Sequence, residues 1–373
     1  MSKILWITWK DAYHPAMGGA EVIAHELTKR LVADGHQVTL LTCGYPGASH
    51  RDQIDGVEVI RVGTSRYIHP VQALLYFLRH LRGNFDILIE EVNGAMPYFS
   101  VFFERVARKY MLYHQLGRRN WLYEIPSPFS YAGYWLLAPG ASRLASLART
   151  PVITVSESTR SMLARHGFPA GRTHIISEGI QAQPLPAVHG VRKYQRPTVL
   201  SLGAMRAMKR TLHQIKAFEL AKARVPALQL KVAGSNHGAY GRQVMRAIEA
   251  SPYAADIDYL GKVSPAEKLQ LMQRSHLILQ TAIEEGWGLT ITEAASQGTP
   301  AAAYDVDGLR DSIRHGQTGL LTPERPDELS AAIVRLVTDR ALYQRLRHAA
   351  WRWSKQITFD RSYTDFTHIL ELA

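Results

Sequence analysis

The chain has 373 residues, of which 46% are hydrophobic, so it is too long for one ordinary domain and apolar enough for two cores. Its formal net charge of +12 indicates an anionic partner, such as a nucleotide or a phospholipid surface. Nucleic acid is not expected, because the chain has no zinc-ligand spacing, basic tail or RNA-binding aromatic signature. The single cysteine, Cys43, excludes a disulfide framework and is typical of a reducing compartment.

The first half of the chain predicts alternating strands and helices. We expect strands at residues 3–9, 38–42, 57–62, 86–90, 110–114, 151–156 and 175–176. We expect helices at residues 22–34, 71–81 and 99–107, and a further helix capped by Ser156. The segment 115–139 contains three prolines, and we expect it to be irregular.

The pattern restarts after a proline-rich linker at residues 181–197. The second half predicts strands at 198–202, 228–233, 257–260, 276–280 and 300–304, and a turn followed by a strand at 316–321. It predicts helices at 211–224, 240–249, 268–274, 289–297, 326–338, 341–354 and 360–372. These elements indicate two α/β domains, residues 1–185 and 195–355, each with a doubly wound parallel sheet. The C-terminal helix, about 356–373, is a candidate to pack back onto the first domain.

The chain is expected to be cytoplasmic. No apolar run reaches the roughly 18 to 20 residues of a spanning helix, and the N-terminus lacks the features of a signal peptide. However, the segment 118–135 combines arginines with tryptophans and tyrosines. It is either ordinary core and surface, or an acceptor or lipid-binding region at the inner face of the membrane. The second alternative predicts binding to anionic liposomes that weakens with salt.

The stretch from Thr281 to Pro300 has the clearest ligand-binding pattern in the chain. A buried strand is followed by a loop with Gly286 and Gly288, and then by a helix. Backbone N–H groups at such a helix start bind anions, and glycines let the backbone approach closely. We expect Glu285 in the loop and Glu293 in the first helical turn. These two carboxylates suit a ligand rich in hydroxyl groups, one carboxylate for each of two sugar rings. The alternative is that these acids only complement the helix dipole.

A second glycine turn, Gly18-Gly19, follows the first strand, where open α/β sheets bind ligands. The chain has no G-x-G-x-x-G sequence, so a nicotinamide or flavin cofactor loses its main support.

Taken together, these motifs resemble the retaining nucleotide-sugar glycosyltransferases of family GT4, also called glycosyl transferases group 1. The matching pieces, in chain order, are Gly18-Gly19-Ala-Glu, the strand-end His114, Val155-Ser-Glu-Ser158, Gly203 to Lys209, Glu285 to Glu293 and Thr318-Gly-Leu-Leu321. The resemblance implies the GT-B fold, in which two Rossmann-like doubly wound domains face a central cleft.

The resemblance also implies roles for individual residues. Glu285 would hold the donor sugar, Glu293 the ribose, and Lys209 would neutralise the diphosphate leaving group. His114 would lie over the donor sugar, which makes His114, Glu285 and Lys209 the expected catalytic residues. The remaining donor-binding residues would be Gly18, Gly19, Gly203, Arg206, Gly261, Val263, Gly286, Trp287, Gly288, Leu289 and Thr290. The alternatives are a helix-flanking cation for Lys209 and a packed core histidine for His114.

The chain departs from the family pattern at three places. Ala204 stands where members often have arginine, and we expect Arg206 to replace it. Ser177-Glu178-Gly179 stands where many members have Pro-Asn-Gly, and Glu284 adds a carboxylate beside Glu285.

Acceptor contacts are expected from Glu91, Asn93 and Arg118. The resemblance implies that no metal is bound, and we expect no cofactor. The two Asp-x-Asp sequences, at 256–258 and 305–307, could suggest a metal site, but they lie at a strand start and in a turn.

The sequence therefore predicts a retaining glycosyltransferase. It would move a hexose from a UDP- or GDP-sugar to a glycan, a lipid-linked saccharide or a small molecule. The alternatives are a non-catalytic nucleotide-sugar or nucleic-acid binding protein, and a GT-B sugar epimerase or phosphorylase.

Overall fold

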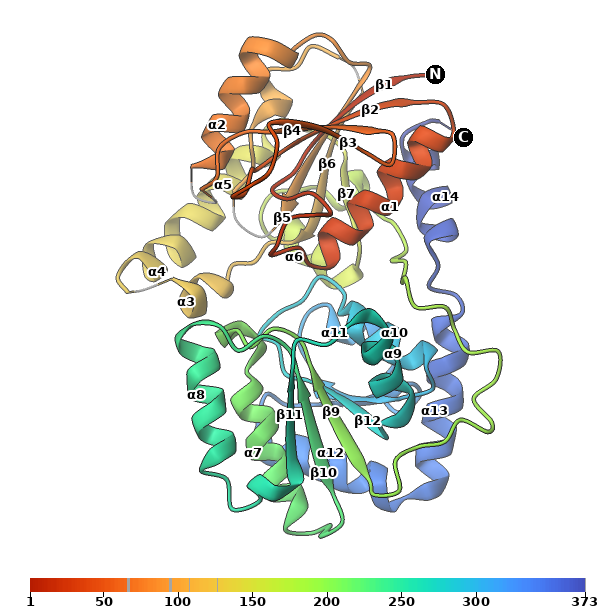
Figure 1. Cartoon of the computed structure of the whole chain (residues 1–373). Helices are drawn as coiled ribbons and strands as arrows, with labels where there is room; N and C mark the ends of the chain where they lie inside the picture. Colours follow the sequence, from red (N-terminus) through yellow and green to blue (C-terminus); the bar gives the residue numbers. More distant parts are fainter. Residues whose placement is uncertain (66–67, 94–95, 107, 126, 373) are drawn as a thin grey trace. The chain divides into compact units, whose positions relative to one another are not determined.

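A computed structural model describes residues 1–65, 68–93, 96–106, 108–125 and 127–372. The chain forms two compact units, each with its own sheet (Figure 1). The first unit consists of residues 1–122, 126–179 and 359–373, and the second of residues 123–125 and 180–358. Apart from residues 123–125, the chain enters the second unit after Gly179 and returns to the first unit after Thr358.

The first unit contains an eight-stranded sheet in the order β3-β4-β2-β1-β5-β6-β7-β8. Its strands are β1 (Lys3–Ile7), β2 (Gln37–Thr42), β3 (Arg51–Ile54), β4 (Val57–Arg61), β5 (Ile87–Asn93), β6 (Arg108–Gln115), β7 (Val152–Thr154) and β8 (Thr173–Ile175). All pairs are parallel except β3 with β4. The helices before residue 180 are α1 (Gly19–Ala33), α2 (His69–Tyr76), α3 (Asn120–Glu124), α4 (Phe129–Ala132), α5 (Ala138–Ser146) and α6 (Glu157–Ala164).

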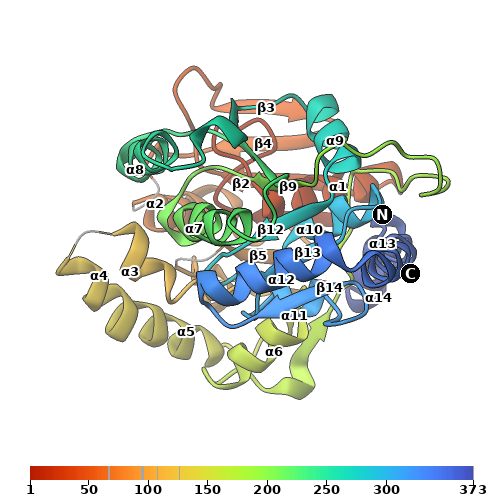
Figure 2. The same ribbon diagram turned by 90° about the horizontal axis from the view of Figure 1, so that it is seen from below.

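The second unit contains a six-stranded parallel sheet in the order β11-β10-β9-β12-β13-β14. Its strands are β9 (Thr198–Leu202), β10 (Gln229–Ala233), β11 (Ile257–Gly261), β12 (Leu277–Gln280), β13 (Ala301–Tyr304) and β14 (Gly319–Thr322). Its helices are α7 (Thr211–Lys222), α8 (Gly238–Glu249), α9 (Pro265–Arg274), α10 (Leu289–Ser296), α11 (Leu309–Ser312), α12 (Pro326–Thr338) and α13 (Arg340–Ser354). Helix α7 contacts α8 and α12, and α10 contacts α9 and α13, so two groups of helices flank the sheet (Figure 2).

Each sheet has a point where the strand order reverses. In the first sheet the reversal lies between β1 and β5, and in the second it lies between β9 and β12. Loops that follow two such strands diverge to opposite sides and leave a crevice at the carboxyl ends. The strand order therefore predicts one ligand-binding edge on each unit.

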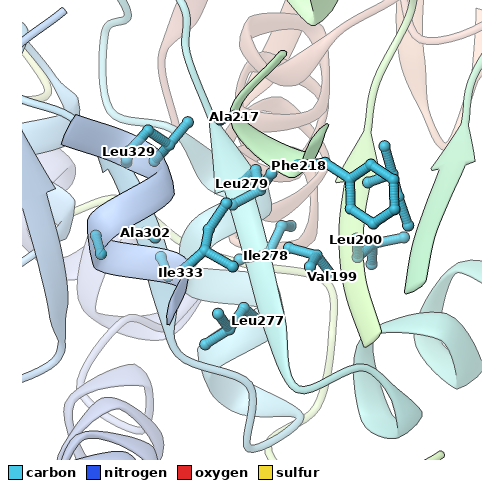
Figure 3. Close-up of a cluster of buried hydrophobic side chains, with 14 of the residues drawn as sticks. Val199, Leu200, Ala217, Phe218, Leu277, Ile278, Leu279, Ala302, Leu329 and Ile333 are labelled. Carbon is cyan, nitrogen blue, oxygen red and sulfur yellow. The ribbon is translucent and has the colours of Figure 1, made fainter. Parts of the chain in front are cut away.

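The second unit is stabilised by a large apolar core between its sheet and its helices. Phe218 of α7 and Ile333 of α12 lie fully buried against central strands (Figure 3). The strand side chains of this cluster include Val199, Leu200, Leu277, Ile278, Leu279 and Ala302. These near-continuous apolar runs are typical of parallel strands covered on both faces, which is why the sequence located the strands well.

The last helix, α14 (Phe359–Ile369), belongs to the first unit although it follows the second in the chain. The ring of Phe366 packs against Trp6, with centroids 5.6 Å apart. Asp365 accepts hydrogen bonds from the backbone N–H (3.0 Å) and the hydroxyl (2.6 Å) of Ser177. The C-terminus of the chain therefore completes the first unit.

Two predictions before residue 180 are wrong. Residues 99–107 do not form a helix: only a 3₁₀ turn, Ser100–Phe102, is present, and Ala107 lies outside the described residues. The segment 115–139 is not irregular, because most of its described part is helical, and helix α5 extends beyond it. Within the described part of the chain, no helix is long and apolar enough to cross a membrane.

Candidate functional site

Lys209 and Glu285 meet at the reversal point of the second sheet. Lys209 follows β9, Glu285 follows β12, and these strands are neighbours. The Lys209 ammonium forms a short ion pair with Oε1 of Glu285, and both side chains are partly exposed. A cation and a carboxylate thus stand together where an open α/β sheet binds its ligand.

The two loops that carry this pair are tied together. The backbone N–H of Ile283 donates to the carbonyl of Met208 (2.9 Å), and the hydroxyl of Thr281 donates to the carbonyl of Lys209 (2.8 Å). The buried guanidinium of Arg210 donates to the carbonyls of Thr281 (2.7 Å) and Ala282 (2.8 Å). Lys209 and Glu285 are therefore held by a fixed backbone rather than by a free loop.

The loop after Glu285 leads into the N-terminus of α10, as the sequence predicts. Gly288 caps this helix with a φ of 94°, a left-handed conformation that favours glycine. The first N–H groups of a helix have no intrahelical acceptor, so those of Leu289 and Thr290 suit an anion. Gly308 packs so closely below this loop that a Cβ would lie 2.2 Å from the Glu285 carbonyl oxygen.

Gly286 and Trp287 complete the loop between Glu285 and α10. Trp287 is half-buried, and its indole Nε1 is buried without a hydrogen-bond acceptor among the described residues. An indole N–H normally finds an acceptor when it is buried. Trp287 therefore has a donor available for a ligand oxygen.

Glu293 lies one turn further along α10 than the sequence predicts. It is the fifth residue of the helix rather than part of the first turn. Its carboxylate pairs with the ammonium of Lys268 on α9 at 2.7 Å and is largely buried. Lys268 was not singled out from the sequence, because 25 residues separate it from Glu293 and no motif marks it.

Three glycine loops lie at the carboxyl ends of neighbouring strands, on the same edge of the sheet as Lys209 and Glu285. Gly203 follows β9 with a φ of 141°, and Gly234 follows β10 with a φ of 149°. A Cβ on Gly234 would lie 1.9 Å from the Gly203 carbonyl oxygen, so this contact requires glycine. The N–H of Gly234 donates to the carbonyl of Gly261 at the end of β11 (2.7 Å). Val263, two residues later, packs against the core, and its predicted role in donor binding stays a prediction.

In the first unit, a glycine turn also leads into a helix beside an acidic side chain, here Glu21. Gly18 is the N-cap of α1 and Gly19 its first residue, so the helix begins three residues before the predicted start. The Glu21 carboxylate accepts from the Gly18 N–H (2.6 Å) and from the Asn93 side chain (2.9 Å), and it pairs with Lys10 (3.2 Å). Glu21 therefore fixes the glycine turn against the end of β5.

Glu91 and His114 form a buried pair next to this turn. Oε1 of Glu91 lies 3.0 Å from Nε2 of His114, and Oε2 accepts from the Trp6 indole at 2.6 Å. Burial lowers the pKa of His114, but the hydrogen bond and charge of Glu91, together with the charge of Glu21, more than offset burial, so the net pKa is raised. Glu91 is fully buried and orients His114; its predicted contact with the acceptor stays a prediction.

Glu178 is a further buried acid near His114. Its side chain is 3% exposed, and Oε2 has no hydrogen-bond partner among the described residues. Burial raises the pKa of Glu178 to about 8, although the charge of His114 lowers it. The carboxyl group is therefore largely protonated at neutral pH.

Comparison with known proteins identifies the chain. Residues 17–183 match the family model described as Glycosyltransferase Family 4, and residues 189–353 match Glycosyl transferases group 1. The chain is a family 4 glycosyltransferase with the GT-B fold.

Individual relatives are distant. The chain is similar, with 24% identity over 95% of both chains, to the GDP-mannose-dependent alpha-(1-6)-phosphatidylinositol monomannoside mannosyltransferase of Mycobacterium tuberculosis. It is 27% identical to the poly(glycerol-phosphate) alpha-glucosyltransferase of Bacillus subtilis over 46% of its own length, but only a quarter of that protein's length is covered. Sucrose-phosphate synthase of Thermosynechococcus elongatus has the same fold, with a TM-score of 0.81, 19% identity, and 100% and 98% of the two chains covered.

Arg206 and Arg118 are already engaged within this glycosyltransferase. The Arg206 guanidinium pairs with Glu124 at 2.9 Å, so its predicted role at the diphosphate stays a prediction. Arg118 stacks on the ring of Tyr134, with 4.2 Å between its guanidinium carbon and the ring centroid, and donates to the Tyr134 carbonyl (3.1 Å). Arg118 thus contacts the helical segment after residue 128, and its predicted acceptor role is also untested.

The acids of both Asp-x-Asp sequences form ion pairs with basic side chains. Asp256 pairs with Arg196 and Lys222, both at 2.6 Å. Asp258 pairs with Lys231 at 2.5 Å. In the second sequence, Asp305 and Asp307 both pair with Arg310 at 2.9 Å. Among the residues that the structure describes, no group of three or more His, Cys, Asp or Glu side chains is arranged to hold a metal ion.

Proposed function

We propose that this glycosyltransferase moves a hexose from a UDP- or GDP-sugar, with retention at the anomeric carbon. The acceptor would be a glycan, a lipid-linked saccharide or a small molecule. The observation that carries the proposal is the Lys209–Glu285 pair at the reversal point of the second sheet. The ammonium suits a departing diphosphate, and the adjacent carboxylate suits the hydroxyl groups of the sugar.

Charge stabilisation is the main catalytic device in this proposal. Breaking the bond between the anomeric carbon and the phosphate oxygen leaves negative charge on the nucleoside diphosphate. Lys209 and the backbone N–H groups at the start of α10 are fixed donors for that charge. Such donors can support departure of the diphosphate, so we expect transfer without an added metal ion.

Retention would follow from transfer on the face that the diphosphate leaves. The acceptor oxygen would bond to the anomeric carbon as the phosphate bond breaks, and the acceptor proton would pass to the departing phosphate oxygen. His114 would contact the donor sugar during this step, with Glu91 holding the imidazole in place. No side-chain nucleophile is required.

A thermal-shift panel followed by an assay tests the proposal. We expect one of UDP, GDP, UDP-glucose or GDP-mannose to raise the melting temperature, because it binds only the folded chain. GDP-mannose is included because it is the named donor of the M. tuberculosis relative. The stabilising sugar nucleotide should then be hydrolysed slowly without acceptor, in the presence of EDTA as well.

Three results would contradict the proposal. Binding without any hydrolysis or transfer would favour a non-catalytic nucleotide-sugar binding protein. Formation of a sugar 1-phosphate from inorganic phosphate and a disaccharide would favour a phosphorylase. A product with the opposite anomeric configuration, measured by NMR, would exclude retention.

A further inference from the structure

One helical segment of the first unit exposes its large apolar side chains. Residues 129–146 form a continuous helix made of α4, the π-helical turn Gly133–Leu137 and α5, because the residues at both junctions have right-handed helical dihedrals (Figure 1). The large apolar side chains that are at least 48% exposed on this helix and just after it are Phe129, Tyr131, Trp135, Leu136, Leu137, Leu144 and Leu147. We call residues 129–147 the docking helix.

The buried face of the docking helix consists of small residues. Its buried positions are Ser130, Gly133, Ala138, Ala141, Ser142 and Ala145. A Cβ on Gly133 would lie 1.8 Å from the ring of Trp121, so glycine is required for this close approach. An ordinary surface helix has the reverse arrangement, with large apolar residues facing the core. The apolar face of this helix is therefore not used for folding, and exposed apolar patches of this kind mark interaction sites.

Charge around the docking helix indicates what it binds. Between residues 115 and 150 the basic side chains are Arg118, Arg119, Arg143 and Arg149, against a single acid, Glu124. Arg118 lies over the ring of Trp135, with 5.4 Å between its guanidinium carbon and the centroid. Exposed Trp, Tyr and Leu side chains flanked by arginines are typical of helices that lie at the surface of an anionic membrane.

We propose that the docking helix binds the surface of an anionic phospholipid bilayer, with Trp135, Leu136 and Leu144 inserted among the acyl chains and the arginines at the headgroups. This inference is independent of the donor and acceptor proposed above. A second copy of the chain is a less suitable partner for this face. In a symmetric dimer the arginines of one copy would face the same arginines of the other, and like charges repel.

Vesicle binding by the full-length chain tests the proposal. We expect the protein to sediment with vesicles of phosphatidylglycerol and phosphatidylcholine, but not with phosphatidylcholine alone, and to be released by high salt. The triple variant Trp135→Ser, Leu136→Ser, Leu144→Ser should lose at least about tenfold in bound fraction. The matched control is Leu220→Ser with Leu260→Ser, exposed leucines of the second unit (38% and 39%), and it should bind as the wild type does.

Two further measurements separate insertion from a loss of folding. The double variant Arg143→Glu, Arg149→Glu should lose the preference for anionic vesicles while keeping its melting temperature. The tryptophan emission should shift to shorter wavelength on vesicles, and Trp135→Phe should remove most of this shift while the protein still binds.

Two outcomes would overturn the proposal. The first is equal vesicle binding by the triple variant and the wild type, or no binding by the wild type at low salt. The second is a dimer in the absence of lipid that the triple variant converts to a monomer, since a second copy would then occupy the helix.

Discussion

The ammonium of Lys209 contacts the carboxylate of Glu285 although 76 residues separate them in the chain. The contact follows from the strand order, because β9 and β12 are neighbours in the sheet and distant in sequence. Lys209, the proposed cation for the diphosphate, is therefore positioned by Glu285, the residue proposed to bind the sugar. Substituting either residue should leave the side chain of the other without its ion-pair partner.

Lys209→Met should reduce the rate of transfer by about a hundredfold to a thousandfold, because a fixed charge at the leaving group is lost. Glu285→Gln should abolish transfer while nucleotide binding stays nearly intact. Both effects are measured from kcat and from the Kd of the nucleoside diphosphate. Lys216→Met is the matched control, since Lys216 is exposed and forms a local ion pair with Glu219 on the same helix. Near-normal transfer by Glu285→Gln would remove Glu285 from the mechanism.

Glu293→Gln should weaken binding of the nucleoside diphosphate by about tenfold, because one charged acceptor for the ribose hydroxyls is lost. The Lys268 ammonium, 2.7 Å from Glu293, would lose its partner at the same time. Titration calorimetry with UDP or GDP measures the effect. Glu267→Gln, one residue before Lys268 on an exposed surface, should leave the affinity unchanged. Equal affinities in both variants would argue against a ribose contact by Glu293.

Glu91→Gln should destabilise the first unit most at low pH. The pKa of His114 is raised in the folded state, so its contribution to stability is complete below the unfolded value of 6.5 and is lost as the pH rises through the folded value. Without the Glu91 charge, burial dominates and the pKa of His114 falls. We expect a loss of about 3 kcal/mol near pH 6 and a smaller loss at higher pH, measured by denaturant unfolding. A loss that does not vary with pH would mean that His114 is not charged.

Glu178→Gln should stabilise the protein at high pH. Burial raises the pKa of Glu178 from 4.5 to about 8 in the folded state. The folded chain disfavours the ionised carboxylate, so stability falls as the pH rises from 4.5 through about 8. Glutamine removes this penalty, and we expect a gain on the order of 3 kcal/mol above pH 8, with little change below pH 4.5. The control is the exposed Glu157→Gln, and a flat difference across this range would contradict the prediction.

The sequence predicts the strands of both sheets better than their connections. Central strands are continuous apolar runs, and both glutamates of the late motif lie near the helix that the sequence places after β12. The edge strand β3 was missed, because three of its four residues are exposed and it has no apolar pattern. Gly234 was missed as a site residue because only the strand order brings it beside Gly203, and Lys268 was missed because the packing of α9 on α10 brings it beside Glu293.

The two incorrect helix predictions have local causes. The carboxylate of Glu90 accepts from the backbone N–H groups of Tyr98, Phe99 and Val101, and this favours a turn over the predicted helix at 99–107. The docking helix was missed because the three prolines of segment 115–139 suggested a loop, and because the buried side chains of the helix are small rather than large and apolar. Pro139 follows a π-helical turn, whose wider ring reduces the usual clash of proline in a helix.

The return of α14 to the first unit has a consequence for how this protein is made. Phe366 fills the space against Trp6, and the Tyr363 hydroxyl donates to Asp34 at 2.5 Å, so the first unit is completed by residues that are synthesised after the whole second unit. On the ribosome, the N-terminal sheet must wait for the whole C-terminal unit before its surface beside β1 is covered. A fragment ending at Gly179 would therefore be soluble and stable only when residues 359–373 are supplied, either fused to it or as a separate peptide.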